Sequence, residues 1–179
     1  MRQGPRLLSA DKASPSDHTY LNVGTVCKCF RQSGQALGWY EQARAIYERE
    51  LAPDDPRLAG LYNNLALVLV DLSRFAEARA LYEKALAIVE RAENGALDAA
   101  ITELNLANLA EAERGLLEAE DEIEARLDRA KGLLEDPSLP RNGYYAFVCE
   151  KCAPTFGYYG RFMDAAELSQ TAEEIYARS

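Results

Sequence analysis

The chain is poor in histidine, and it has no long apolar run. A single histidine, His18, among 179 residues leaves little material for acid–base catalysis or for a zinc site. A membrane-spanning helix needs an apolar stretch of about eighteen residues or more, and the chain has none. The first residues also lack the apolar core of a secretory signal. These features favour a soluble protein that is not an enzyme and binds no cofactor.

Acidic residues outnumber basic ones, with 29 Asp and Glu against 20 Lys and Arg and a formal net charge of −9 at pH 7. Such a surface argues against binding to nucleic acid or to an anionic membrane. Hydrophobic residues make up 48% of the chain, which is typical of a globular protein rather than a disordered one.

The four cysteines form two close pairs, Cys27 with Cys29 and Cys149 with Cys152. Without an export signal we expect a cytoplasmic location and free thiols. Cys149 and Cys152 have the spacing of metal ligands, but Cys27 and Cys29 would point about 200° apart on a helix and cannot complete a tetrahedral site. We therefore expect no metal. Cys27, Cys149 and Cys152 fall at apolar positions and are interpreted as core residues, whereas the reactivity of Cys29 stays open.

Internal repetition decides the fold. Three segments align at offsets of 42 and 41 residues, Tyr20-Leu-Asn-Val-Gly24, Tyr62-Asn-Asn-Leu-Ala66 and Glu103-Leu-Asn-Leu-Ala107. A second signature recurs as Gly38-Trp-Tyr-Glu-Gln-Ala43, Ser73-Arg-Phe-Ala-Glu-Ala78 and Gly160-Arg-Phe-Met-Asp-Ala165. Period, pattern and order all repeat, so each unit is one structural module.

Each module reads as two helices joined by a short turn, because apolar residues recur at helical spacing and breakers separate the segments. The expected helices are 18–34, 39–52, 57–72, 75–92, 97–114, 116–135, 144–158 and 161–178. The sequence thus predicts an all-α, right-handed superhelical array of about four antiparallel helix pairs, an α-solenoid. Its repeats would be 18–53, 57–93, 97–135 and 143–178 in a single domain, 18–179, after a flexible N-terminal segment, 1–17.

Small residues recur where neighbouring helices must approach closely. In the first helix of each pair they are Gly24, Ala66, Ala107 and Ala153, and in the second helix they are Ala43, Ala78, Ala119 and Ala165. Tyr40, Phe75 and Phe162 follow the turns, where a ring can wedge between two helices.

These motifs resemble tetratricopeptide repeats, and the 42-residue period with the segment PDDPRLAGLYNNLA resembles the kinesin-light-chain subtype. The resemblance covers residues 18–179. The chain departs from the pattern before Gly38, where about seven residues are extra, at Gly115, where no aromatic residue follows, and at Pro154, which predicts a distorted last pair.

The resemblance implies a non-enzymatic protein–protein interaction module whose first helices line a concave groove. Asn22, Asn64 and Asn105 lie opposite the core side of their helices, and the resemblance implies that they hold the backbone of a bound peptide. The alternative is that each bonds to its own helix or to a loop. The predicted groove comprises Asn22, Thr25, Lys28, Asn63, Asn64, Leu67, Asp71, Leu104, Asn105 and Asn108, with Lys151 in place of Asn in the fourth repeat.

A second reading is a self-assembling or secretion-chaperone-like protein that uses its last helix pair. No capping helix follows the final segment, so an apolar face would be left for a second copy, a partner or a further region of chain. The residues expected there are Phe162, Leu168, Ile175 and Tyr176. An acidic run between Glu111 and Glu124 is interpreted as a solvated helix face, with steering of a basic partner as the alternative.

Overall fold

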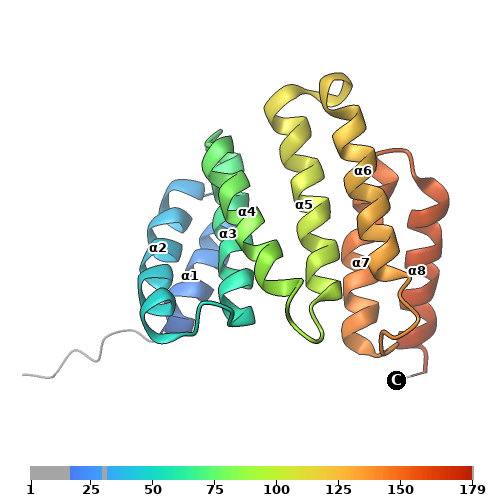
Figure 1. Cartoon of the computed structure of the whole chain (residues 1–179), viewed down its shortest axis with the longest axis horizontal. Coiled ribbons are helices and arrows are strands. Elements are labelled where there is room, and N and C mark those ends of the chain that lie inside the picture. Colours follow the sequence, from blue (N-terminus) through green and yellow to red (C-terminus); the bar gives the residue numbers. More distant parts are fainter. Residues whose placement is uncertain (1–16, 30–31, 179) are drawn as a thin grey trace, which may run out of the picture.

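The computed structural model describes residues 17–29 and 32–178, which form eight α-helices and no strand. The helices are α1 (Asp17–Cys29), α2 (Ser33–Glu50), α3 (Pro56–Asp71), α4 (Phe75–Val89), α5 (Ala96–Arg114), α6 (Leu116–Leu134), α7 (Gly143–Tyr158) and α8 (Phe162–Tyr176). The helix pairs follow one another across the molecule in chain order, from α1 and α2 on one side to α7 and α8 on the other (Figure 1). The all-α repeat array is therefore confirmed. The predicted N-terminal segment, 1–17, lies outside the described residues apart from Asp17.

Consecutive helices pair as hairpins, α1 with α2, α3 with α4, α5 with α6 and α7 with α8. Between hairpins, α3 packs on α2 and α5 packs on α4. The first helices of successive pairs also contact one another, α1 with α3, α3 with α5 and α5 with α7. Within the described residues, contacts between successive second helices are sparser. The first helices therefore form the inner side of the array, and the second helices form its outer side.

Local sequence explains where the helices begin. Asp55 caps α3, because its carboxylate accepts a hydrogen bond from the Arg57 backbone N–H at 2.9 Å, and Pro56 occupies the first helical position. Asn142 caps α7 in the same way and accepts from the Tyr145 N–H at 3.0 Å. The Pro-rich and Asn-containing breakers in the sequence are thus helix-start signals.

Three hairpin turns contain a residue with positive φ, one or two positions before the second helix of the pair begins. These residues are Ser73 (φ 57°), Gly115 (φ 83°) and Gly160 (φ 80°). Glycine adopts this conformation freely, whereas in serine the Cβ atom makes it sterically unfavourable. The Gly and Ser of the repeated turn signature therefore reverse the chain direction.

The first hairpin turns earlier than predicted. α1 ends at Cys29 rather than at residue 34, and α2 already begins at Ser33 rather than at residue 39. Gly38 therefore lies inside a helix instead of in the turn, and Tyr40 lies further from the start of its helix than expected. The extra residues lengthen the second helix to 18 residues, compared with 15 in α4 and in α8. Residues 33–37 carry no helix breaker other than Gly34, which is why helix formation extends through them.

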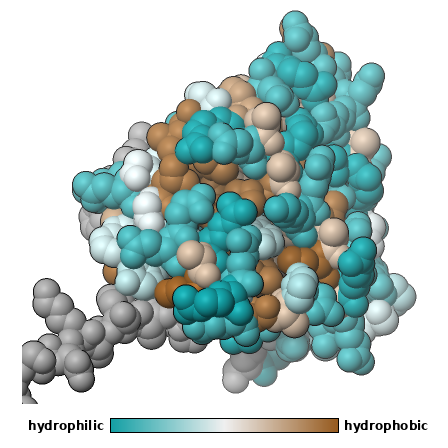
Figure 2. All heavy atoms as spheres, turned by 60° about the vertical axis from the view of Figure 1, so that its left-hand side comes forward, coloured by the Kyte–Doolittle hydropathy of each residue, from teal (hydrophilic) through white to brown (hydrophobic). Residues whose placement is uncertain are grey.

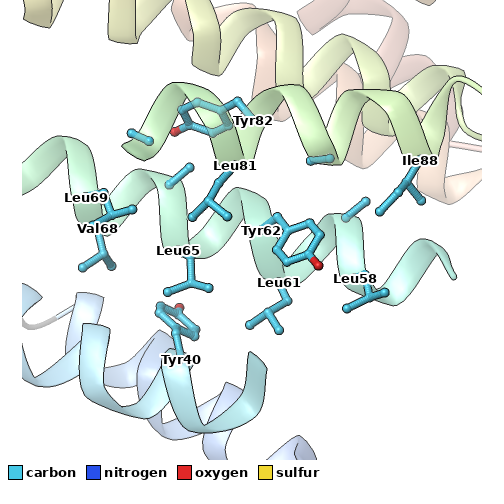
Figure 3. Close-up of a cluster of buried hydrophobic side chains, with 14 of the residues drawn as sticks. Tyr40, Leu58, Leu61, Tyr62, Leu65, Val68, Leu69, Leu81, Tyr82 and Ile88 are labelled. Carbon is cyan, nitrogen blue, oxygen red and sulfur yellow. The ribbon is translucent and has the colours of Figure 1, made fainter. Parts of the chain in front are cut away.

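The small-residue pattern is confirmed where α1 meets α2. A Cβ atom added at Gly24 would lie 2.7 Å from the ring of the fully buried Tyr40. Tyr40 in turn faces Leu61 and Leu65 of α3, and Leu81 of α4 fills the space behind them (Figure 3). The close approach that the sequence predicts at Gly24 is therefore what admits the tyrosine ring.

The core is divided into two clusters that share one helix. The first cluster spans α1 to α4 and includes Ala99, Leu106 and Leu109 of α5. The second spans α6 to α8 and takes its α5 members from other sides of the same helix: Leu97, Ala100, Leu104, Ala107 and Ala110. α5 is consequently buried in both halves of the array.

The last helix pair departs from expectation at Pro154. α7 continues from Gly143 to Tyr158 through this proline, whose ring lies on the exposed side of the helix. Phe162 also differs from the predicted wedge, because 71% of it is exposed, whereas Phe75 is half-buried. Outside the core, hydrophilic residues cover most of the face shown in Figure 2, with hydrophobic residues gathered between them. None of the described helices is long and apolar enough to cross a bilayer.

Candidate functional site

The exposed stripes of the four first helices make one continuous surface, which we call the inner wall. At about 100° per residue, each stripe repeats every three or four positions. We define the inner wall by Asn22 and Thr25 of α1, Asn64, Leu67 and Asp71 of α3, Asp98, Asn105, Asn108 and Glu111 of α5, and Tyr144, Phe147, Lys151 and Tyr158 of α7, none of which is fully buried.

Carboxamides of neighbouring first helices meet at the edge of the inner wall. The Asn105 amide donates to the Asn63 carbonyl oxygen at 3.3 Å, and the Asn63 amide donates to the Thr102 hydroxyl at 3.0 Å. Asn64, the predicted partner in this row, is half-buried and makes no hydrogen bond to a described residue. The hydrogen-bonded row thus runs through Asn63, while Asn64 keeps its donor and acceptor available.

Other predicted groove residues lie at different depths. Thr25 is exposed, and its hydroxyl donates to the Leu21 carbonyl at 3.0 Å. Lys28 and Leu67 are half-buried, and Leu67 packs on the first core cluster. Leu104 corrects the prediction: it is buried in the second core cluster, because its position on α5 faces the helices of that cluster rather than the open side. Asn22 is exposed on α1.

Tyrosine–carboxylate hydrogen bonds join α5 to α7 near both ends of the contact between these two helices. The Tyr144 hydroxyl donates to Asp98 at 2.7 Å. At the other end, the Tyr158 and Tyr159 hydroxyls donate to Glu111 at 2.7 Å and 2.9 Å. Burial, and then the hydrogen bond to the carboxylate, raise the pKa of Tyr144 and of Tyr159. The phenols therefore stay protonated and remain donors at neutral pH. Helical periodicity does not reveal these bonds.

Carboxylates of the inner wall differ from those elsewhere in their partners. Away from the inner wall, carboxylates meet arginines: Arg79 of α4 bonds Glu113 of α5 at 2.7 Å and Glu122 of α6 at 2.9 Å. On the inner wall, Asp98 and Glu111 accept hydrogen bonds from neutral hydroxyls and form no ion pair with a described residue. Asp71 is likewise bonded by the Ser33 hydroxyl at 3.1 Å. Their negative charge is thus uncompensated at the surface.

Two of the hollows near α7 have walls of mixed polarity. One, of about 190 Å³, adjoins the Glu111 end of the inner wall and is lined by Leu116, Leu117, Ile123, Tyr158 and Tyr159, with Glu120 and Glu124. The other, of about 290 Å³, opens between α6 and α8 and has Leu134, Phe156 and Leu168 among its apolar walls and Lys131 and Asp164 among its polar ones. Only the first is continuous with the inner wall, through Tyr158.

The cysteines lie in the core as predicted. Cys27, Cys149 and Cys152 are free and buried. Burial raises the pKa of the Cys149 thiol to about 11 and that of Cys152 to about 12. The side chain of Cys29 lies outside what the structure describes. In the described part of the chain, no three His, Cys, Asp or Glu side chains are grouped so that they could hold a metal ion.

The residues predicted for self-association do not share one face. Phe162 and Tyr176 are exposed, with 71% and 45% of their surface accessible. Leu168 and Ile175 are half-buried and pack against the second core cluster. The exposed apolar surface instead continues from Phe162 to Met163, which is 83% exposed.

Comparison with known proteins identifies the repeats. The family model described as "Tetratricopeptide repeat" matches residues 16–91 and 57–132. Among solved structures, BtubC (BKLC) from P. vanneervenii is similar, with 19% identity and a TM-score of 0.59 over 94% of this chain and 67% of that one. A putative kinesin light chain from Podosopora anserina with nearly identical TPR-like repeats has 18% identity and a TM-score of 0.57 over 93% of this chain and 80% of that one. At these identities the likeness concerns the fold. Curated proteins gave no match.

Proposed function

We propose that this chain, which belongs to the tetratricopeptide repeat family, binds an extended segment of another protein along its inner wall. The fold is that of a protein–protein interaction module. The finer statement, that the inner wall is the contact surface and that the ligand lies extended across the first helices, is our proposal.

The observation that supports it is the arrangement of carboxamides across adjacent helices. The hydrogen bond between Asn105 and Asn63 places the side chains of α5 and α3 within reach of one another, and Asn64 and Asn108 stand beside them on the open side. A carboxamide donates and accepts, so a row of them pairs with a peptide backbone whatever its side chains are. One extended segment can therefore contact several repeats at once.

Selection from a random peptide library tests the proposal. Peptides enriched on the wild-type chain are measured against the variant Asn64→Ala/Asn105→Ala by fluorescence anisotropy. Each lost hydrogen bond is worth about 1 kcal/mol, so we expect affinity to fall about tenfold or more. Asn94→Ala, which removes an exposed carboxamide from the loop between α4 and α5, is the matched control and should bind as the wild type does. Enriched peptides that bind the double variant unchanged would refute the proposal.

Self-association is a second candidate, favoured by the exposed apolar residues at the start of α8. Phe162 and Met163 are 71% and 83% exposed, and Tyr158 beside them is 67% exposed. Burial of such rings between two copies would release about 25 cal/mol for each Å² removed from water. Sedimentation velocity at rising concentration should show dimers that Phe162→Ser abolishes. A strict monomer at high concentration would refute this candidate.

A further inference from the structure

One face of α7 is aromatic and exposed. Tyr144 and Phe147 are 47% and 50% exposed, and their rings stack with centroids 6.3 Å apart. One exposed ring, Tyr158, lies two heptads beyond Tyr144 along the same stripe. Exposed apolar faces with polar neighbours are typical of interaction surfaces, and aromatic residues dominate the binding energy of such surfaces. This part of the inner wall is therefore where a partner segment gains most from contact.

Charges alternate along that face. At one end, Tyr144 holds the Asp98 carboxylate at 2.7 Å, and at the other, Tyr158 holds the Glu111 carboxylate at 2.7 Å. Lys151 lies midway between the two tyrosines, is exposed, and forms no ion pair with a described residue. Along the contact between α5 and α7, the order is thus negative (Asp98 of α5), positive (Lys151 of α7) and negative (Glu111 of α5).

The spacing of Lys151 and of the two tyrosines that hold the carboxylates defines a register. Tyr144, Lys151 and Tyr158 are seven residues apart, which corresponds to roughly 10.5 Å per step at a helical rise of about 1.5 Å. In a polyproline-II segment, every third side chain points to the same side and the step is about 9.3 Å. Long charged side chains easily span the difference of about 1 Å per step.

We propose that the inner wall recognises a partner segment in the polyproline-II conformation that carries Lys or Arg at position i, Asp or Glu at i+3, and Lys or Arg at i+6. The proposal rests on the proposed function and deepens it by stating the chemistry of the ligand. The two basic side chains meet Asp98 and Glu111, and the acidic one meets Lys151. The pattern reads the same in both chain directions, so either orientation of the segment satisfies it.

Charge complementarity selects this occupant over others. Neutral hydroxyls fix the positions of Asp98 and Glu111 without neutralising their charge. A basic side chain of the bound segment would therefore be the first to form an ion pair with each of them. A segment with acidic ends would face like charges at both places, which costs affinity and slows association. The hollow of about 190 Å³ beside Tyr158 accommodates an apolar side chain next to the basic residue that meets Glu111.

Two synthetic peptides of about 13 residues test the register. Both have a proline- and alanine-rich background and identical composition, with Lys, Glu, Lys at i, i+3 and i+6 in one and Lys, Lys, Glu in the other. Because their net charge is equal, non-specific attraction to the acidic protein is equal too. We expect the first to bind at least fivefold more tightly in fluorescence anisotropy, and we expect 1 M salt to remove most of the difference, since the Debye length then falls to about 3 Å.

A charge reversal at the central position adds a second test. With Lys151→Glu, each of the two peptides would make two favourable charge contacts and one repulsive contact, so the preference between them should disappear. Arg91→Glu changes the net charge by the same amount at an exposed site in the loop after α4, and should leave the order of preference unchanged.

The outcomes separate this inference from the proposed function. If both peptides bind equally and Asn105→Ala weakens the binding of both, the charge register is refuted but binding to the inner wall stands. Equal binding that Asn105→Ala does not affect would overturn both. A preference that is present in the wild type but survives Lys151→Glu unchanged would overturn the register as well.

Discussion

The ion pair between Glu103 and Arg126 predicts how strongly the third repeat depends on buried charge. Arg126 Nη1 lies 2.8 Å from the Glu103 carboxylate, and their side chains are only 15% and 3% exposed. The second repeat has Tyr62 at the place of Glu103, so the pair replaces an aromatic contact. In addition, the Arg126 Nε is buried and has no hydrogen-bond partner among the described residues.

Removal of one partner should cost far more than removal of both. Loss of one side of a buried pair costs about 3–5 kcal/mol, because it leaves an uncompensated charge in the core. For Glu103→Ala we expect about 3 kcal/mol, the lower end, since Glu122 remains 3.7 Å from Arg126. The double variant Glu103→Leu/Arg126→Met replaces the charges with apolar groups of similar size and should lie within about 1 kcal/mol of the wild type.

Urea unfolding followed by circular dichroism measures these values. The variants are compared at equal protein concentration with linear extrapolation to water. Glu50→Ala, which alters an exposed carboxylate paired with Arg49, is the control and should change stability by less than about 0.5 kcal/mol. A Glu103→Ala loss below about 1 kcal/mol, or a double variant less stable than Glu103→Ala, would contradict the reasoning.

Four further predictions concern the backbone and the thiols. Ser73→Gly should stabilise the fold by about 1 kcal/mol in urea unfolding, because it relieves a left-handed conformation at φ 57°; an unchanged midpoint would refute this. Gly95→Ala should lower the thermal midpoint, because its Cβ would lie 1.8 Å from the last carbonyl oxygen of α4, whereas Gly34→Ala meets nothing within 4 Å and should not. Burial raises the pKa of Cys149 to about 11 and of Cys152 to about 12, so a thiol reagent at pH 8 should label both far more slowly in the native protein than in urea. Because the thiols ionise first in the unfolded chain, the free energy of unfolding should fall as the pH rises from about 9 to about 11, as urea titrations at several pH values would show.

Much of the fold could be predicted because its signals are local. Helical spacing of apolar residues identified the helices, and the small residues at Gly24 and Ala66 identified the close approaches. The first turn was misplaced because Gly38-Trp-Tyr matches the turn signature of the other repeats. The correct turn position is the one that brings Tyr40 over Gly24. This contact exists only when α1 and α2 pack together, so the sequence of the turn segment alone does not reveal it.

The candidate site was predictable by face but not by partner. Periodicity placed Asn64 and Asn105 on the open side of their helices, yet the Asn105 amide donates its hydrogen bond to Asn63, one position before Asn64. The crossing of adjacent helices decides this choice. The bond from Tyr144 to Asp98 was missed for a related reason, since it joins residues 46 positions apart in helices of different repeats. Side-chain reach across helices has no periodic signature in a single sequence.

The shared helix α5 has a consequence for the way the molecule responds to force and to truncation. In repeat arrays, neighbouring units contribute stability additively, and melting can begin at one end and halt at any weak boundary. Here a break on either side of α5 would remove buried side chains from one of the two core clusters. Leu106 and Leu109 belong to the first cluster, and Leu104 and Ala107 belong to the second. Truncation in the middle of the chain, next to α5, should therefore destabilise the remaining fragment. A segment bound across Asn105 and Glu111 would lie on the helix that contributes buried residues to both halves.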